Sequence, residues 1–171
     1  MTNVIFLCTG NAARSVMATV MARDRAPSLS IRGAGTLSIP DLPMSQRTRI
    51  ALQAMGLEDR EHRSHQLDTG DTQWADVIVA FEPDHIRYLR RHHPEASGIA
   101  ATLPRLIRDL DDTASPLRCR LHALGLGQVA VDAWEEVIDP AGGDQDVFHA
   151  CAAEISALVD ALLPRLAEST L

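Results

Sequence analysis

The 171-residue sequence contains no lysine, and all 16 of its Lys/Arg positions are arginines. Arginine favours paired hydrogen bonds to phosphate where it is well placed, although coding bias produces the same composition. The formal net charge is −7. Proteins that bind nucleic acid need a basic surface to displace counterions from phosphates. We therefore expect no nucleic-acid partner.

Cysteine and long apolar runs are also scarce. The three cysteines, at positions 8, 119 and 151, are odd in number and lack paired spacing, which predicts neither a disulfide framework nor a zinc site. We expect free thiols and no metal. The sequence has no uninterrupted apolar run of about 18 residues and no signal-peptide pattern at its N-terminus. These absences predict a cytoplasmic protein without a membrane partner.

Apolar residues make up 46% of the chain, enough for one buried core in a single domain spanning residues 1–171. Apolar runs and helical patterns alternate along it. This order predicts an α/β fold with a small doubly wound parallel sheet. The expected strands are residues 3–7, 29–33, 75–81 and 97–103, and the expected helices are residues 16–23, 45–55, 83–93 and 144–166.

The first expected strand ends in a short loop of small residues, Cys8-Thr9-Gly10-Asn11-Ala12-Ala13-Arg14-Ser15. A loop of this kind can curl tightly and direct successive backbone N–H groups inward as an anion-binding nest. The helix that follows adds the positive end of its dipole. We therefore expect a phosphate-binding loop formed by Thr9, Gly10, Asn11, Ala12, Ala13 and Ser15.

Cys8 and Arg14 lie at opposite ends of this loop, separated by five residues. Arg14 at the rim can hold two phosphate oxygens, and Cys8 at the base can attack the phosphorus in line. The field of the loop favours thiolate over thiol. The spacing alone is a weak signal. The preceding strand, the Gly10-Asn11 turn and the following helix are separate requirements, and all are met.

The stretch Val4 to Met17 resembles the signature of the low-molecular-weight protein tyrosine phosphatases, whose loop has the form C-x5-R-S. The resemblance implies a flavodoxin-like, doubly wound four-stranded parallel sheet with helices on both faces, a phosphocysteine intermediate and no cofactor. Further segments match in the family's order along nearly the whole chain: Ala34-Gly35-Thr36, Pro43-Met44-Ser45, His62-Arg63-Ser64, Asp76 to Phe81 and Asp139-Pro140-Ala141-Gly142-Gly143.

The resemblance also implies roles for residues outside the loop's two ends. Asp139 matches the general acid that protonates the leaving group, although an Asp-Pro dipeptide standing alone indicates an ordinary turn. Asn11, Ser15 and His62 match positions that brace the loop. Ser15 can also support the thiolate as it leaves the phosphoenzyme.

Three departures from the family pattern lie near the site, where Ala13 replaces a common second cysteine, Val16 a proline and Gly33 a bracing serine. The segments 37–39 and 141–142 supply no aromatic cleft wall. We expect phosphotyrosine in a protein as the leading substrate and inorganic phosphate as the product. A small phosphomonoester stays open as the substrate, because aromatic residues make up only 4% of the chain.

Two alternative functions remain. An arsenate reductase uses a similar loop. Its thioredoxin-coupled form needs a cysteine pair after the third strand, and residues 74–103 contain no cysteine. Only coupling to a low-molecular-weight thiol stays open. A non-catalytic phosphoprotein-binding module would be expected to have lost Cys8, Arg14 or Asp139, and all three are present.

Cys119 and Cys151 lie on apolar helical patterns, where free cysteine usually packs in the core. Trp74 and Trp134 are also predicted to pack in the core or at its edge, and Trp134 is the better candidate for a cleft wall because it lies five residues before Asp139.

Overall fold

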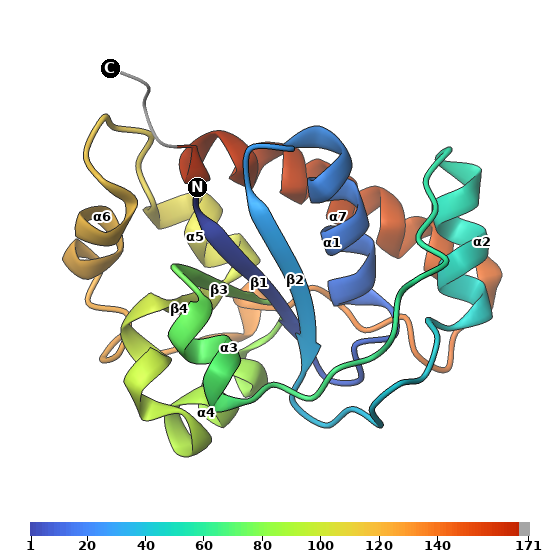
Figure 1. The fold of residues 1–171 in the computed structure, drawn as a ribbon, viewed down its shortest axis with the longest axis horizontal. Helices are drawn as coiled ribbons and strands as arrows, with labels where there is room; N and C mark the ends of the chain where they lie inside the picture. Colours follow the sequence, from blue (N-terminus) through green and yellow to red (C-terminus); the bar gives the residue numbers. More distant parts are fainter. Residues whose placement is uncertain (168–171) are drawn as a thin grey trace.

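A four-stranded parallel sheet forms the centre of the protein, as seen in a computed structural model that describes residues 1–167. The strand order is β2-β1-β3-β4, and β1 and β2 are seen side by side in Figure 1. In the register, Val4 lies opposite Ile31 on one side and Val77 on the other. The predicted α/β doubly wound fold is confirmed. The strands are β1 (Asn3–Cys8), β2 (Ser30–Gly35), β3 (Val77–Ala80) and β4 (Ala100–Thr102).

Seven α-helices and two 3-10 turns connect and cover the strands in the described part of the chain. They are α1 (Arg14–Arg25), α2 (Gln46–Ala54), α3 (Thr69–Trp74), α4 (Pro83–His92), η1 (Pro94–Ile99), α5 (Leu103–Asp109), α6 (Leu117–Ala123), η2 (Ala133–Glu135) and α7 (Gln145–Leu166). The helix starts follow local chemistry. The Ser45 side chain accepts the N–H of Thr48 at the start of α2, and Asp144 accepts that of Val147 at the start of α7.

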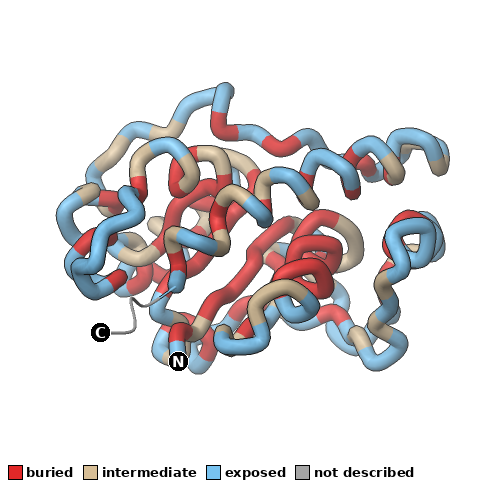
Figure 2. The backbone as a smooth tube through the Cα atoms, turned by 90° about the horizontal axis from the view of Figure 1, so that it is seen from above, coloured by how far each residue is buried: buried red, intermediate tan, exposed pale blue. Residues whose placement is uncertain are grey.

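Both faces of the sheet are covered, which is why the central strands β1 and β3 are nearly continuous apolar runs, whereas the edge strand β2 carries the exposed Arg32. Val4 and Phe6 point into a core built with α1, α5 and α7, whereas Ile5 and Leu7 pack toward α4 on the other face. Figure 2 shows the buried strands at the centre and the exposed turns around them. By length and composition α7 could cross a membrane. Its apolar side, including Ile155, is buried against this core.

Two sequence predictions about buried side chains are wrong. Cys119 is exposed, because α6 turns Leu117, Arg120 and Leu121 inward and leaves Cys119 outside. Arg120 can be buried because its guanidinium donates to backbone carbonyls, including that of Arg165. Val147 is likewise exposed although it lies on the apolar pattern of α7.

Candidate active site

The loop after β1 lies at the carboxyl edge of the sheet, where β2 and β3 also end. Asn11 adopts a left-handed conformation with φ of 50°, which turns the chain sharply before α1 begins. A Cβ on Gly35 would lie 2.5 Å from the carbonyl oxygen of Thr9, so only glycine allows β2 to approach this closely. The Ala12 carbonyl accepts hydrogen bonds from the Ser45 N–H and the Thr48 hydroxyl. The outer side of the loop is therefore fixed by contacts with β2 and with the start of α2.

The inner side of the loop offers donors. Within residues 1–167, no group accepts a hydrogen bond from the N–H groups of Gly10, Asn11, Ala12 or Ala13. Arg14 starts α1, so the helix dipole points its positive end at the same place. Such a ring of unpaired donors can hold a tetrahedral oxyanion.

Cys8 lies at the base of the loop and is 3% exposed. Its Sγ is 2.9 Å from the Oγ of Ser15, and that Oγ accepts a hydrogen bond of 2.8 Å from Asn11 Nδ2. Because the Ser15 oxygen accepts from Asn11, its own proton is free to point at the sulfur. The Ser15 hydroxyl can therefore donate a hydrogen bond to the Cys8 sulfur.

Arg14 is 1% exposed and its guanidinium contacts two carboxylates. One terminal nitrogen donates to Glu82 Oε2 at 2.5 Å and to the Val137 carbonyl at 2.9 Å. The other donates to Asp139 Oδ2 at 3.1 Å. The three predicted catalytic residues, from positions 8, 14 and 139, therefore converge at one edge of the sheet.

Glu82 is a site residue that the sequence analysis missed. It lies two residues after the end of β3 and directly precedes Pro83, the first residue of α4. The signal was available, because the carboxyl ends of parallel strands meet at one edge, and an acid that ends the strand next to β1 must lie near the Cys8 loop.

Asp139 lies on a segment that is tied to the sheet. The Val137 N–H donates to the carbonyl of Phe81 at 2.7 Å, directly after β3. Asp139 Oδ1 accepts the N–H of Ala141 at 3.0 Å, which closes a local turn. The Asp139 side chain is 42% exposed. It can therefore reach both Arg14 and a group arriving from solvent.

Two histidines touch the loop. His62, the predicted brace, is 3.0 Å from the Asn11 carbonyl through Nε2, and burial lowers its pKa. His85 was not predicted. It is 2% exposed, with Nε2 3.0 Å from Thr9 Oγ1 and Nδ1 accepting the N–H of Phe81 at 3.3 Å. Burial, helped by the charge of Arg14, lowers the pKa of His85 to about 3.

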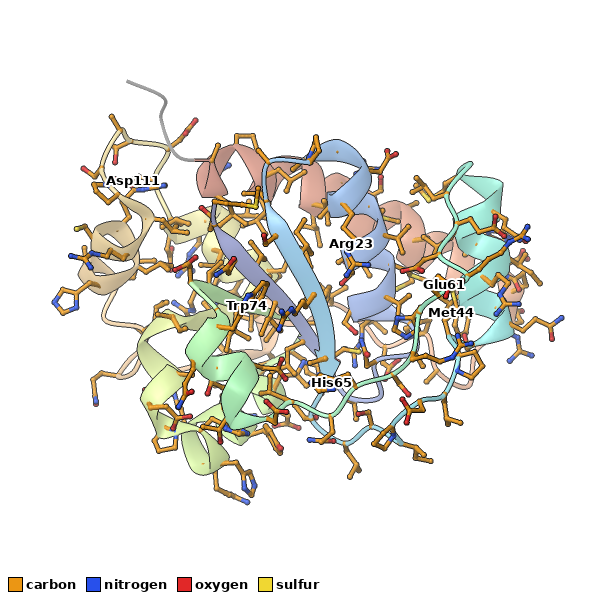
Figure 3. The ribbon with its side chains drawn as sticks, viewed as in Figure 1. Arg23, Met44, Glu61, His65, Trp74 and Asp111 are labelled. Carbon is orange, nitrogen blue, oxygen red and sulfur yellow. The ribbon has the colours of Figure 1, made fainter. Side chains whose placement is uncertain are left out.

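A hollow of about 670 Å³ lies beside this site along the open edge of β2. Figure 3 shows Arg23 on α1, and Glu61 and His65 on the segment between α2 and α3, around this region. His65, Asp68 and Asp71 on its wall bring possible metal-ligand atoms within 4.8 Å of one another. Asp68 and Asp71 already form the capping box that starts α3. We assign no ion to them.

Trp134, expected to pack in the core or at its edge and named as the better cleft-wall candidate of the two tryptophans, lies at the surface against arginine side chains. It is 42% exposed, and the guanidinium groups of Arg105 and Arg108 lie over its ring at 5.3 and 4.0 Å. Exposed aliphatic side chains lie on the segments next to the loop instead. Leu37, whose N–H donates to the Thr9 carbonyl, is 79% exposed, and Ile138, next to Asp139, is 70% exposed.

The fold and the loop define an α/β protein with a cysteine at the base of an oxyanion nest. Residues 3–115 match the profile of the family described as low molecular weight phosphotyrosine protein phosphatase. Low molecular weight protein-tyrosine phosphatase A of Mycobacterium bovis is 30% identical over 172 residues, which cover 96% of this chain and 88% of that protein. The chain therefore belongs to the low molecular weight phosphotyrosine protein phosphatase family.

A second relative carries a different name within the same family. A protein-arginine-phosphatase of Geobacillus stearothermophilus is 26% identical over 164 residues, which cover 95% of each chain. The solved structure of the YwlE arginine phosphatase from that organism superposes with a TM-score of 0.76 at 24% identity, over 95% of this chain and 90% of that one. This likeness supports the fold assignment.

Proposed function

We propose that the protein hydrolyses phosphorylated side chains of proteins, phosphotyrosine first among them, through a phosphocysteine at Cys8. One observation carries the proposal. The Cys8 sulfur, the buried Arg14 guanidinium and the Asp139 carboxylate converge around a loop of unpaired N–H groups. In this proposal Cys8 is the nucleophile, Arg14 binds the phosphate and Asp139 donates a proton to the leaving group.

The reaction has two steps in this proposal. The Cys8 thiolate attacks phosphorus, an S–P bond forms while the bond to the leaving oxygen breaks, and Asp139 gives that oxygen a proton. Water then attacks the phosphocysteine and gives a proton to the Asp139 carboxylate. The S–P bond breaks, its electron pair returns to sulfur, and inorganic phosphate leaves. The Ser15 hydroxyl stabilises the departing thiolate. Neither step uses a metal or cofactor.

Phosphate binding requires Arg14 to change partners. Its two terminal nitrogens are engaged by Glu82 and Asp139. A bound phosphoryl group needs a bidentate contact with the guanidinium. We infer that the phosphoryl group displaces the half-exposed Asp139 and binds the terminal nitrogen so freed together with Nε of Arg14, while Glu82 keeps the other terminal nitrogen. Asp139 is then free to face the leaving group.

Phosphoarginine in proteins is the second candidate substrate. The relative named protein-arginine-phosphatase aligns over 95% of both chains. The aliphatic side chains of Leu37 and Ile138 offer no aromatic face on which a phenyl ring could stack. The same chemistry would cleave a P–N bond, with Asp139 protonating the leaving nitrogen.

The test compares para-nitrophenyl phosphate, a phosphotyrosine peptide and a matched phosphoarginine peptide, with arsenate reduction measured in parallel. We expect phosphate release that Cys8→Ser abolishes, because a hydroxyl at this site is not ionised as a thiol is. Cys119→Ser is the matched control, since Cys119 is exposed on α6. Normal turnover by Cys8→Ser would remove the mechanism. Thiol-dependent arsenate reduction without phosphatase activity would assign the chain to the reductases.

The remaining parts of the proposal concern context. We propose that the chain works as one domain over residues 1–171, in the cytoplasm, on a phosphorylated protein or a small phosphomonoester. No nucleic acid or membrane is needed for the proposed reaction. The net charge of −7 supports the first of these exclusions.

A further inference from the structure

Thr9 and His85 form a buried pair directly beside the nucleophile. Thr9 follows Cys8 in the chain, and its hydroxyl oxygen lies 3.0 Å from His85 Nε2. His85 is the third residue of α4 and is 2% exposed, whereas Thr9 is only partly buried. The pair thus joins the rim of the Cys8 loop to the helix that follows β3.

The contacts of His85 determine which nitrogen carries its proton. Nδ1 accepts the backbone N–H of Phe81, so this nitrogen has no hydrogen of its own. A neutral imidazole then carries its proton on Nε2. Nε2 faces two possible acceptors, Thr9 Oγ1 at 3.0 Å and Glu82 Oε1 at 3.8 Å. Only the first distance is that of a hydrogen bond, so His85 donates to Thr9.

The direction of this bond leaves the Thr9 hydroxyl proton free. Its oxygen accepts from His85, and within residues 1–167 this oxygen has no other hydrogen-bond partner. The backbone of Thr9 is also fixed, because its carbonyl accepts the N–H of Leu37 at 2.9 Å. The hydroxyl proton of Thr9, the residue next to Cys8, therefore has no acceptor among residues 1–167.

We propose that the Thr9 hydroxyl donates a hydrogen bond to the bound phosphoryl group and that His85 is the positioning residue that orients it. This inference rests on the proposed phosphatase function and adds two side chains to it. A neutral histidine suits this task, since it neither repels the Arg14 guanidinium nor competes with it for phosphate. The charged groups around His85 are Arg14, Glu82 and Asp84.

The test uses substitutions of His85 that each keep a polar atom at only one of its two ring-nitrogen positions, together with substitutions of Thr9. His85→Gln places an amide nitrogen where Nε2 was and can still donate to Thr9. His85→Asn can accept from Phe81 but cannot reach Thr9. Thr9→Val removes the hydroxyl at nearly constant shape, and Thr9→Ser restores it. His93→Gln is the control, because His93 is also buried and directly follows α4, beside Glu95.

The measurement is competitive inhibition by inorganic phosphate, with direct phosphate binding by calorimetry. We expect Thr9→Val to weaken phosphate binding roughly tenfold to a hundredfold, as for loss of one hydrogen bond to a charged group. His85→Asn should weaken it more than His85→Gln, and Thr9→Ser should recover part of the loss. In the Thr9→Val background, His85→Asn should cost nothing further, because its partner is already gone.

Two results would overturn the inference. Phosphate inhibition that Thr9→Val leaves unchanged would show that the hydroxyl does not reach the phosphoryl group. Losses from Thr9→Val and His85→Asn that add in the double variant would show that His85 acts only through packing. The parent protein separates these results from a failure of the proposed function, since a protein that neither binds phosphate nor hydrolyses phosphate esters would refute that function first.

Discussion

Arg14 illustrates how one buried cation serves structure and site together. A guanidinium at 1% exposure needs compensating charge, and Glu82 and Asp139 provide it. Glu82 is the more buried of the two carboxylates, with its side chain 22% exposed against 42% for Asp139. The proposed reaction uses this difference, with Glu82 as the lasting partner of Arg14 and Asp139 as the one that leaves it to face the leaving group.

Replacing Asp139 should separate binding from catalysis. Asp139→Asn should slow hydrolysis by about 10² to 10⁴, the usual value of a general acid, and more for leaving groups that need a proton than for para-nitrophenol. The same change should tighten inhibition by phosphate or vanadate, because the amide competes less well for Arg14. Steady-state kinetics with inhibitor titration measures both. An equal loss on every substrate with weaker inhibition would indicate a structural role.

His85 should make the protein labile to acid. Its pKa is about 3 in the folded protein and about 6.5 when unfolded. Below pH 6.5 the unfolded chain therefore binds the extra proton, so folding stability falls with decreasing pH until about pH 3. Each pH unit in this window costs about 1.4 kcal/mol.

Urea unfolding at pH 7 and pH 5 tests this expectation. Going from pH 7 to pH 5, the native protein should lose about 2 kcal/mol more stability than His85→Gln, because the variant has no group to protonate there. Because both proteins contain the other histidines, the contribution of those histidines to the pH dependence of stability cancels in the comparison. Equal losses in the two proteins would mean that His85 is solvated, contrary to its burial.

At the scale of elements, the segment that carries Asp139 is fixed by the buried ion pair between Glu135, four residues before Asp139, and Arg105 on α5. Glu135 is fully buried and accepts hydrogen bonds from the Arg105 guanidinium at 2.5 and 2.9 Å and from Thr102 at 2.7 Å. Burial alone would raise the pKa of Glu135, but these donors outweigh it and the pKa is lowered. The pair joins η2 to α5, just before Val137 reaches the end of β3.

Breaking the Glu135–Arg105 pair should destabilise the protein and loosen the segment that carries Asp139. Glu135→Gln removes the buried carboxylate partner of Arg105 and leaves it only the partly exposed Asp109. A loss of about 3 kcal/mol in unfolding free energy is expected. Glu136→Gln, at the exposed neighbouring position, is the control. Chemical denaturation measures the stability of both. A change of about 0.5 kcal/mol or less in Glu135→Gln, the range of ordinary surface substitutions, would contradict the anchoring role.

The elements that the sequence predicts well are those with long patterns or clear caps. Ser45 marks the start of α2, Gly56 follows its end with φ of 74°, and the apolar run into β3 is continuous. Helix α3 was not predicted. It has six residues and little apolar periodicity, and it depends on the Asp68–Asp71 capping box. Short elements of this kind are decided by local hydrogen bonds that a search for periodicity passes over.

The residues of the candidate site also divide into those that the sequence predicts and those that it does not. Cys8 and Arg14 are the two ends of one short loop, so the sequence alone places them at the same site. Asp139 was placed by family resemblance alone. A parallel sheet places the residues after β3 near the Cys8 loop, but the contacts of Glu82 with Arg14 and of His85 with Thr9 depend on how β3 pairs with β1. Sequence reasoning therefore identifies the loop and the edge where its neighbours lie, and the structure shows their contacts.

At the scale of the whole molecule, the three thiols lie in three different environments. Cys8 is in the loop after β1, Cys119 is exposed on α6, and Cys151 is buried on α7. Burial raises the pKa of the Cys151 thiol to about 12, so it remains protonated at neutral pH. A protonated thiol neither attacks nor oxidises readily. Ala13 takes the place where a second loop cysteine would lie.

This distribution predicts how the enzyme responds to peroxide. Cys8 oxidised to sulfenic acid has no thiolate beside it in the loop, so it should continue to the sulfinic and sulfonic acids and recover poorly with dithiothreitol. A disulfide requires the two Cα atoms to come within about 7 Å. Ala13→Cys adds a thiol within the loop itself and should trap the first oxidation product as a reducible disulfide.

Activity after timed peroxide exposure and reduction, with mass spectrometry of the peptides, measures the outcome. We expect the Ala13→Cys variant to recover more activity than the native sequence, and its Cys8 to be found linked to position 13. Cys151→Ser is the control, because Cys151 lies under the Asp139 segment, with Sγ 3.9 Å from the Ile138 carbonyl. Full recovery of the native sequence with Cys8 linked to Cys151, and loss of that recovery in Cys151→Ser, would show that this segment moves far enough for α7 to protect the nucleophile.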